Sequence, residues 1–179
     1  MRTIARNGLW IGAAVVALWA PSTGWAQRAL SPVRVTVTAQ ADDLDRQAEE
    51  LYGKPSLWRR AAYMHERAAS MRAATDPQAY AGYRMAAHLY HAAGSLSEAR
   101  AAMERAAVQA SARGDVVGAA NSYVDAGLVA LEARQDDRVR EFAVKAEALA
   151  GSPLLSAEQR RAILERVGYR QLSAAISQR

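Results

Sequence analysis

The chain repeats itself at an interval of 38 residues, and this periodicity restricts its fold more than any other feature of the sequence. Residues 48–69 align with residues 86–107 without a gap, and small, apolar and aromatic positions coincide, as at Tyr52 and Tyr90. A weaker third copy follows after a further 40 residues. A unit of this length buries its apolar face only by stacking on the next unit, so we expect an array of similar units.

Each unit has the start and stop signals of two helices joined by a tight turn. In the second unit, Asp76 is a good N-cap, Gly94 suits a left-handed helix end, and Ser95 with Glu98 predicts a capping box for the next helix. Ser156 and Gln159 predict another capping box. The helices predicted in this way cover residues 77–93, 95–113, 116–134 and 137–149, with a last helix after Ser156.

The composition favours helices that pack closely. Hydrophobic residues make up 51% of the chain, but alanine dominates them and there is only one phenylalanine. Alanine and arginine favour helix, and β-branched residues are sparse outside residues 33–38. The prediction is therefore an all-α fold.

One stretch carries a spacing of small, aromatic, turn and large apolar positions, at Ala87, Tyr90, Gly94, Leu96, Ala99, Met103 and Ala106. This spacing resembles the tetratricopeptide repeat (TPR) family, and the resemblance covers residues 42–149. Three of the slots recur in each of the other units, at Tyr52, Ala61 and Ala68 and at Gly127, Val139 and Ala146. The resemblance implies a right-handed α-solenoid of about three TPR-like helix pairs, with the last helix as a polar C-terminal cap.

The sequence departs from the family pattern in three respects. Its units are 38 and 40 residues long, whereas the family's usual unit has about 34. Arg134 stands where the turn glycine is expected, and Ala130 occupies the aromatic slot of the third unit. The alternative is a generic alanine-rich helical bundle without regular stacking.

The N-terminal segment has the features of a signal peptide at residues 1–26. Arg2 and Arg6 precede an apolar run over residues 9–20, and small residues at Gly24 and Ala26 predict cleavage after Ala26. We therefore expect a periplasmic or secreted protein. The alternative is an uncleaved membrane anchor.

The rest of the chain divides into three parts. Valines at every second position within residues 33–37 predict an extended linker or short strand over residues 27–40. The TPR-like helical repeat domain is expected over residues 41–168. Residues 169–179 are expected to form a C-terminal tail or an extension of the last helix.

Charge and residue types argue against several functions. The net charge of +5 falls to +3 without Arg2 and Arg6, and no basic stripe appears, so we expect no nucleic-acid partner. The chain has no cysteine. His88 and His91 share a helix face but lack an evident third ligand, so neither a metal nor a cofactor is expected.

Catalytic motifs are also missing from the sequence. It has neither a G-x-S-x-G elbow nor a phosphate-binding glycine loop. Paired acids have the character of helix-start charges, and a hydrolase that uses them is the enzymatic alternative. These pairs are Asp42-Asp43, Glu49-Glu50 and Asp136-Asp137.

The TPR resemblance implies that the first helix of each unit lines a concave groove for a peptide. The corresponding positions are Asp43, Arg46 and Glu50, then Ala81, Arg84, His88 and His91, then Asn121, Val124, Leu128 and Leu131. We expect an acidic group of the ligand near Arg84 and an apolar side chain near Leu128.

The predicted function is a non-catalytic, exported scaffold that mediates protein–protein interaction in the cell envelope. The alternatives are a structural component of an envelope assembly and a membrane-anchored adaptor. Because each helix offers little apolar area, a homo-oligomer is also considered, in which a second copy covers an exposed end of the stack.

Overall fold

The computed structural model describes residues 24–168, and every regular element in this range is helical, which confirms the all-α prediction. A 3-10 turn, η1 (Pro55–Leu57), precedes α2. The helices are α1 (Gly24–Glu49), α2 (Trp58–Met71), α3 (Pro77–Ala92), α4 (Leu96–Ala112), α5 (Val116–Glu132), α6 (Asp136–Ala150) and α7 (Ala157–Val167). Residues 1–23 of the predicted signal peptide and the predicted tail at 169–179 lie outside the described residues.

Side chains cap several helices as the sequence predicts. The Asp76 carboxylate accepts a hydrogen bond from the backbone N–H of Gln78 at 2.8 Å, and Ser156 forms the predicted capping box with Gln159. The capping box predicted for Ser95 was wrong, because its side chain makes no cap hydrogen bond. Glu98, its expected partner, instead accepts a hydrogen bond from Arg59 of α2 at 2.6 Å. A contact between helices has therefore replaced a local one.

Three successive turns share one backbone geometry. Gly94, Gly114 and Arg134 end α3, α4 and α5 in the left-handed conformation, with φ of 72°, 74° and 56°. The residue that follows each of these donates a hydrogen bond from its backbone N–H to the carbonyl five positions earlier in the chain. The pairs are Ser95 with Tyr90, Asp115 with Ala110 and Gln135 with Ala130, at 2.8–2.9 Å. The turn at Arg134 thus departs from the repeat in sequence but not in structure.

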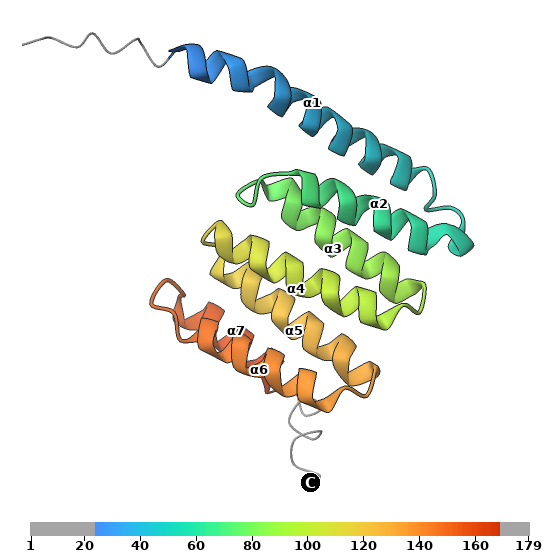
Figure 1. The fold of residues 1–179 in the computed structure, drawn as a ribbon. Helices are drawn as coiled ribbons and strands as arrows, with labels where there is room; N and C mark the ends of the chain where they lie inside the picture. The colour runs from blue at the N-terminus through green and yellow to red at the C-terminus, as the bar shows by residue number, and fades with distance from the viewer. Residues whose placement is uncertain (1–23, 169–179) are drawn as a thin grey trace, which may run out of the picture.

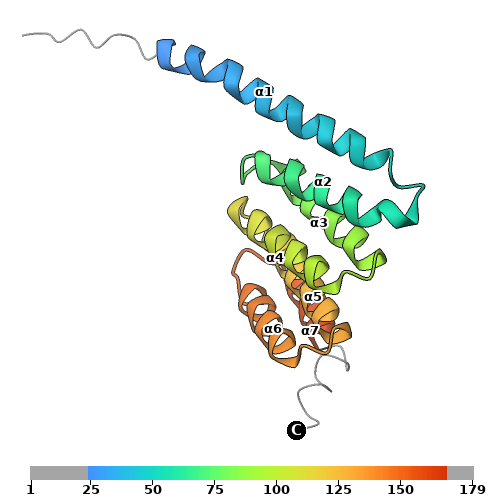
Figure 2. The same ribbon diagram turned by 45° about the vertical axis from the view of Figure 1, so that its right-hand side comes forward.

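The helices form two layers. Consecutive helices from α1 to α6 pack side by side, and α7 packs on both α5 and α6 (Figures 1 and 2). Side-chain contacts also join alternate helices: His91 of α3 lies 2.6 Å from Glu132 of α5, and Lys145 of α6 pairs with Glu104 of α4 at 2.9 Å. We call the surface of α1, α3, α5 and α7 the odd-helix face and that of α2, α4 and α6 the even-helix face.

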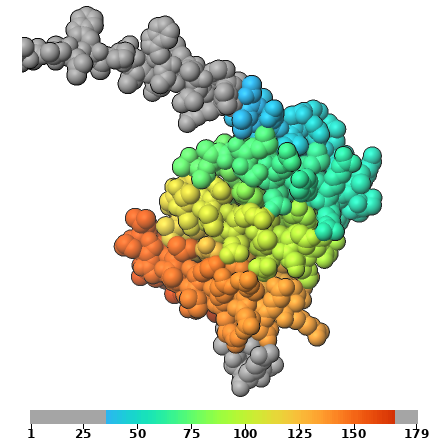
Figure 3. All heavy atoms as spheres, viewed as in Figure 1, coloured from blue at the N-terminus to red at the C-terminus, as the bar shows by residue number. Residues whose placement is uncertain are grey.

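Small residues let these helices cross closely. Most core positions are alanines, and Phe142 is the largest fully buried side chain among the described residues. At the crossing of α2 and α3, a Cβ added to Gly82 would lie 3.0 Å from the Cβ of Ala69, so no larger side chain fits there without a shift. The stack, seen as spheres in Figure 3, is therefore closely packed but holds few large apolar groups.

Residues 27–40 correct the sequence prediction. They belong to α1 and are helical, so the extended linker or short strand was wrong. An isolated strand leaves its backbone groups without partners, whereas a helix satisfies them within the segment. The N-terminal half of α1 extends past the end of α2 (Figures 1 and 2), and the predicted cut after Ala26 would fall in its first turn. None of the described helices is long and apolar enough to cross a membrane.

Candidate functional site

The predicted groove positions lie on α1, α3 and α5, except for Glu50, which directly follows α1. These helices belong to one layer, so the structure brings the positions to the same layer, although not all of them face outward. The hydrogen bond between His91 and Glu132 shows that α3 and α5 adjoin there. The three sets of positions nevertheless differ in what they offer a ligand.

The α1 positions form a small network of their own. The guanidinium of Arg46 binds the carboxylate of Asp43 and that of Glu50, the latter at 2.9 Å, and all three side chains are exposed. Hydrogen bonds from Arg46 and Gln47 lower the pKa of Asp43, and the bond to Asp43 raises the pKa of Arg46. Because Arg46 already pairs with both carboxylates, its guanidinium is not free to bind an acidic group of a ligand.

The α5 positions correct the prediction of an apolar end to the groove. Val124 is only 2% exposed and belongs to the core. Leu128 and Leu131 are half-buried and pack against that core. Asn121 receives a hydrogen bond from Arg166 of α7. The apolar positions of α5 are therefore buried or half-buried, and none of them offers an exposed apolar side chain to a ligand.

The α3 positions are more accessible. Ala81, His88 and His91 are exposed and Arg84 is half-buried, with its guanidinium 5.8 Å from the ring centroid of Tyr80. The buried Nε of Arg84 has no hydrogen-bond partner among the described residues. Partial desolvation of the imidazole and the positive charge of Arg84 lower the pKa of His88, so this imidazole stays neutral at neutral pH. A cation with a spare donor therefore lies at the centre of the odd-helix face.

A hollow of about 370 Å³ lies between α1 and α3 on the same face. Ala81, Gly82 and Met85 of α3 line one side, and the exposed side chain of Met85 offers an apolar contact. Gln78 of α3 adds a polar group to this side. The rest of the lining is polar and comes from α1, α2 and the loops that follow them: Asp42, Asp45, Arg46, Glu49, Tyr52, His65 and Arg72.

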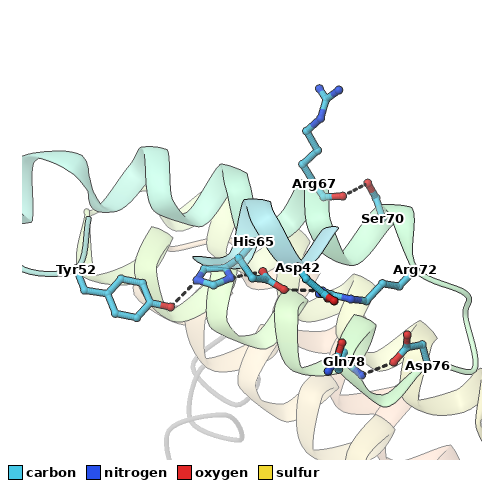
Figure 4. Close-up of polar contacts among 9 residues, drawn as sticks. Asp42, Tyr52, His65, Arg67, Ser70, Arg72, Asp76 and Gln78 are labelled. Carbon is cyan, nitrogen blue, oxygen red and sulfur yellow. Dashed lines mark hydrogen bonds and ion pairs between the residues drawn. The ribbon is translucent and has the colours of Figure 1, made fainter. Parts of the chain in front are cut away.

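A chain of polar contacts, buried at His65 and at the side chain of Arg72, lines this hollow (Figure 4). The hydroxyl of Tyr52 bonds Nε2 of His65, and Nδ1 of His65 lies 2.6 Å from Oδ1 of Asp45. Nη1 of Arg72 lies 2.6 Å from Oδ2 of Asp45, and Nη2 of Arg72 donates to Asp42 at 2.7 Å. We call these five residues the Asp45 network. It ties α1 to α2 and to the loop after α2.

The surroundings of Asp45 and Tyr52 fix the protonation state of each side chain. Burial acts to raise the pKa of Asp45, but hydrogen bonds from His65 and Arg72 outweigh it, so the pKa is lowered and the carboxylate stays charged. Burial, with the negative charges of Glu49 and Asp45, raises the pKa of Tyr52 and keeps the phenol neutral. Both ring nitrogens of His65 are engaged, so neither is free to act on a substrate.

The acidic pairs considered for hydrolysis are largely engaged as well. Asp42 pairs with Arg72, Asp43 and Glu50 pair with Arg46, and Asp137 pairs with Arg140. A glycosidase acid needs a carboxyl whose pKa is raised, whereas that of Asp43 is lowered. No cluster of three or more metal-ligating side chains occurs in the described part of the chain.

The Asp45 network was not predicted from the sequence. A signal was present, because Asp45 lies between the buried residues Ala41 and Ala48 on the face of α1 that packs on α2. An acidic residue on such a stripe needs a buried partner. The sequence does not identify that partner, because Arg72 lies in the loop beyond the next helix.

Comparison of the chain with protein-family models, curated proteins and solved structures gave no match. The fold and the site themselves define a class: an all-α chain whose stacked helices present a hollowed, polar face. Its function has to be argued from that face.

Proposed function

We propose that this chain is a non-catalytic, exported TPR-like scaffold that binds a protein or peptide partner on its odd-helix face. The observation that carries the proposal is the hollow between α1 and α3, which the Asp45 network holds in shape beside the accessible positions of α3. Binding to a preformed surface avoids the cost of ordering it.

Regular stacking in a right-handed solenoid of about three helix pairs is part of the proposal. Ion pairs between alternate helices join residues 39 or 41 apart, close to one sequence unit, as in Arg59 with Glu98 and Arg166 with Asp125. The repeated turn geometry at Gly94, Gly114 and Arg134 gives further support. A generic bundle would not be expected to repeat the same contacts from unit to unit.

The partner we envisage is a peptide segment with an apolar side chain and an acidic group. Its apolar side chain would enter the hollow beside Met85, and its acidic group would meet Arg84. Met85 replaces the apolar contact expected at Leu128, which is half-buried against the core. An acid at Arg84 would also provide an acceptor for the unpartnered Nε of that residue.

Export is the second part of the proposal and rests on the N-terminal sequence pattern. The N-terminus of the protein recovered from cells tests it: a chain that begins at Gln27 establishes cleavage, whereas one that retains residues 1–26 favours the membrane-anchored adaptor. A structural component of an envelope assembly is the other alternative, and it needs no ligand in the hollow.

The decisive experiment fills the hollow. Ala81→Trp places a large side chain at its exposed edge, and Ala92→Trp makes the same change at an exposed position of α3 that does not line the hollow. Both variants and the native chain are used for affinity capture from envelope extract. A partner retained by the native chain and by Ala92→Trp, but lost by Ala81→Trp, supports the proposal. Equal capture by all three overturns it.

A further inference from the structure

The even-helix face contains a second hollow, of about 540 Å³, between α2 and α4. Ion pairing between Arg59 and Glu98 shows that these helices adjoin. Tyr83 of α3 reaches the hollow from the other layer, and its ring packs against Ala69 and Ala106. This volume falls in the range of small-molecule binding sites, about 300–1,000 Å³.

One cation in this hollow is unpaired. Arg105 pairs with Glu66, which also accepts a hydrogen bond from the hydroxyl of Tyr90 at 3.0 Å, so the charge of Glu66 is already balanced. The guanidinium of Arg67 makes no ion pair with any described residue, and Figure 4 shows its side chain extending away from the Asp45 network. The hollow therefore keeps one net positive charge.

The positions that align with Arg67 in the other two units are both cations with an acidic partner. Arg67 aligns with Arg105 in the second unit and with Lys145 in the third. Arg105 binds the carboxylate of Glu66, and Lys145 binds that of Glu104, so each cation takes a carboxylate from the even helix before it. No even helix precedes α2 in the described part of the chain, and Arg67 is left without this carboxylate.

Tyr83 provides a second free donor. Its side chain is more than nine-tenths buried, and its hydroxyl has no hydrogen-bond partner among the described residues. Burial raises the pKa of Tyr83, so the phenol remains protonated and able to donate. The exposed ring of Tyr63 and the half-buried Met71 add apolar surface beside these donors.

We propose that the hollow between α2 and α4 binds a single carboxylate joined to an apolar body, held by Arg67 and Tyr83. Arginine receives a carboxylate with two parallel hydrogen bonds, and one free cation matches one negative charge. The apolar body would lie against Tyr63 and Met71. This site is separate from the odd-helix face and goes beyond the scaffold function proposed for it.

Calorimetric titration of the full-length protein with phenylacetate tests the proposal, with phenylacetamide as the uncharged control. We expect saturable binding of the acid alone, a loss of at least about tenfold in affinity for Arg67→Gln, and a several-fold loss for Tyr83→Phe. Arg60→Gln removes the same charge from an exposed position of α2 outside the hollow and should bind like the native chain. Circular dichroism checks that each variant keeps its helicity.

A second pair of probes identifies the source of the carboxylate. An acetylated Ala-Ala-Phe peptide with a free carboxyl terminus is compared with its amide. Tighter binding of the peptide acid than of phenylacetate indicates a protein C-terminus, whereas weaker binding indicates a small organic acid. The proposal is overturned if the acids do not bind, if the amides bind equally well, or if Arg60→Gln weakens binding as much as Arg67→Gln.

Discussion

Replacing Asp45 with asparagine tests whether the Asp45 network holds α1 on the rest of the stack. The carboxylate contacts both His65 and Arg72 at 2.6 Å, and the side chain of Arg72 is only 3% exposed. Hydrogen bonds to charged groups contribute about 1.5–3 kcal/mol each, and breaking a buried ion pair costs about 3–5 kcal/mol. Because Asp42 still neutralises Arg72, we expect a loss of about 2–3 kcal/mol.

Tryptophan fluorescence can follow this loss locally. In the mature chain predicted from Gln27, Trp58 is the sole tryptophan, and its indole donates to the backbone of Tyr52 at 2.9 Å, beside the network. Circular dichroism reports all helices together. In Asp45→Asn we expect the Trp58 transition to fall by about 1 M urea and to precede the circular dichroism transition. In the native chain we expect the two transitions to coincide.

A matched control and the pH dependence sharpen this test. Asp43→Asn changes an exposed acid on the same helix and should leave both transitions unchanged. The pKa of Asp45 is lowered in the folded state, so its contribution is present above its ordinary value of 3.8 and is lost as the pH falls below it. Native and Asp45→Asn stabilities should therefore converge in acid. Equal effects of the two substitutions at neutral pH would refute the reasoning.

Three further predictions concern the core, the odd-helix face and a turn. Phe142→Ala empties a fully buried site and should cost about 3–5 kcal/mol in urea unfolding, whereas Val144→Ala, at a position 63% exposed, should change little. In an NMR titration His88 should protonate below its ordinary pKa of 6.5, so that stability rises with pH across this interval, and His88→Gln should abolish that slope. Arg134→Gly should stabilise the chain by about 1 kcal/mol, measured by urea unfolding, because glycine adopts the left-handed conformation of this residue without a Cβ penalty.

Local signals made much of the fold predictable. Asp76 and Ser156 cap helices as expected, because a cap depends on residues only two or three positions away. The repeat located the turn at Arg134 even though that residue is not glycine. The prediction of a linker or strand for residues 27–40 failed, because a short alternation of valines carries no information on whether a partner strand exists.

The candidate site was less predictable, because the packing of the helices decides which side chains are exposed and which are paired. Val124 and Leu128 resemble ligand-binding positions in sequence, but they pack in or against the core, and α7 packs on the same helix. The hollow between α1 and α3 depends on Arg72, which lies in a loop and pairs with residues 27 and 30 positions earlier. Such pairings follow from the packing of the helices and not from local sequence.

The ion pairs of the even-helix face also set a limit on growth of the stack. Glu66 and Glu104 each supply a carboxylate to the cation of the following unit. The aligned position in the third unit is Val144, which has no charge to pass on. A second copy added end to end would therefore find no acid for its Arg67, so this contact does not favour end-to-end growth of the stack. Removal of the middle unit, by contrast, would take away Arg105 and Glu104 and leave Glu66 opposite Lys145. These two residues have opposite charges, so we expect the first and third units to pack with the same alignment of their helices.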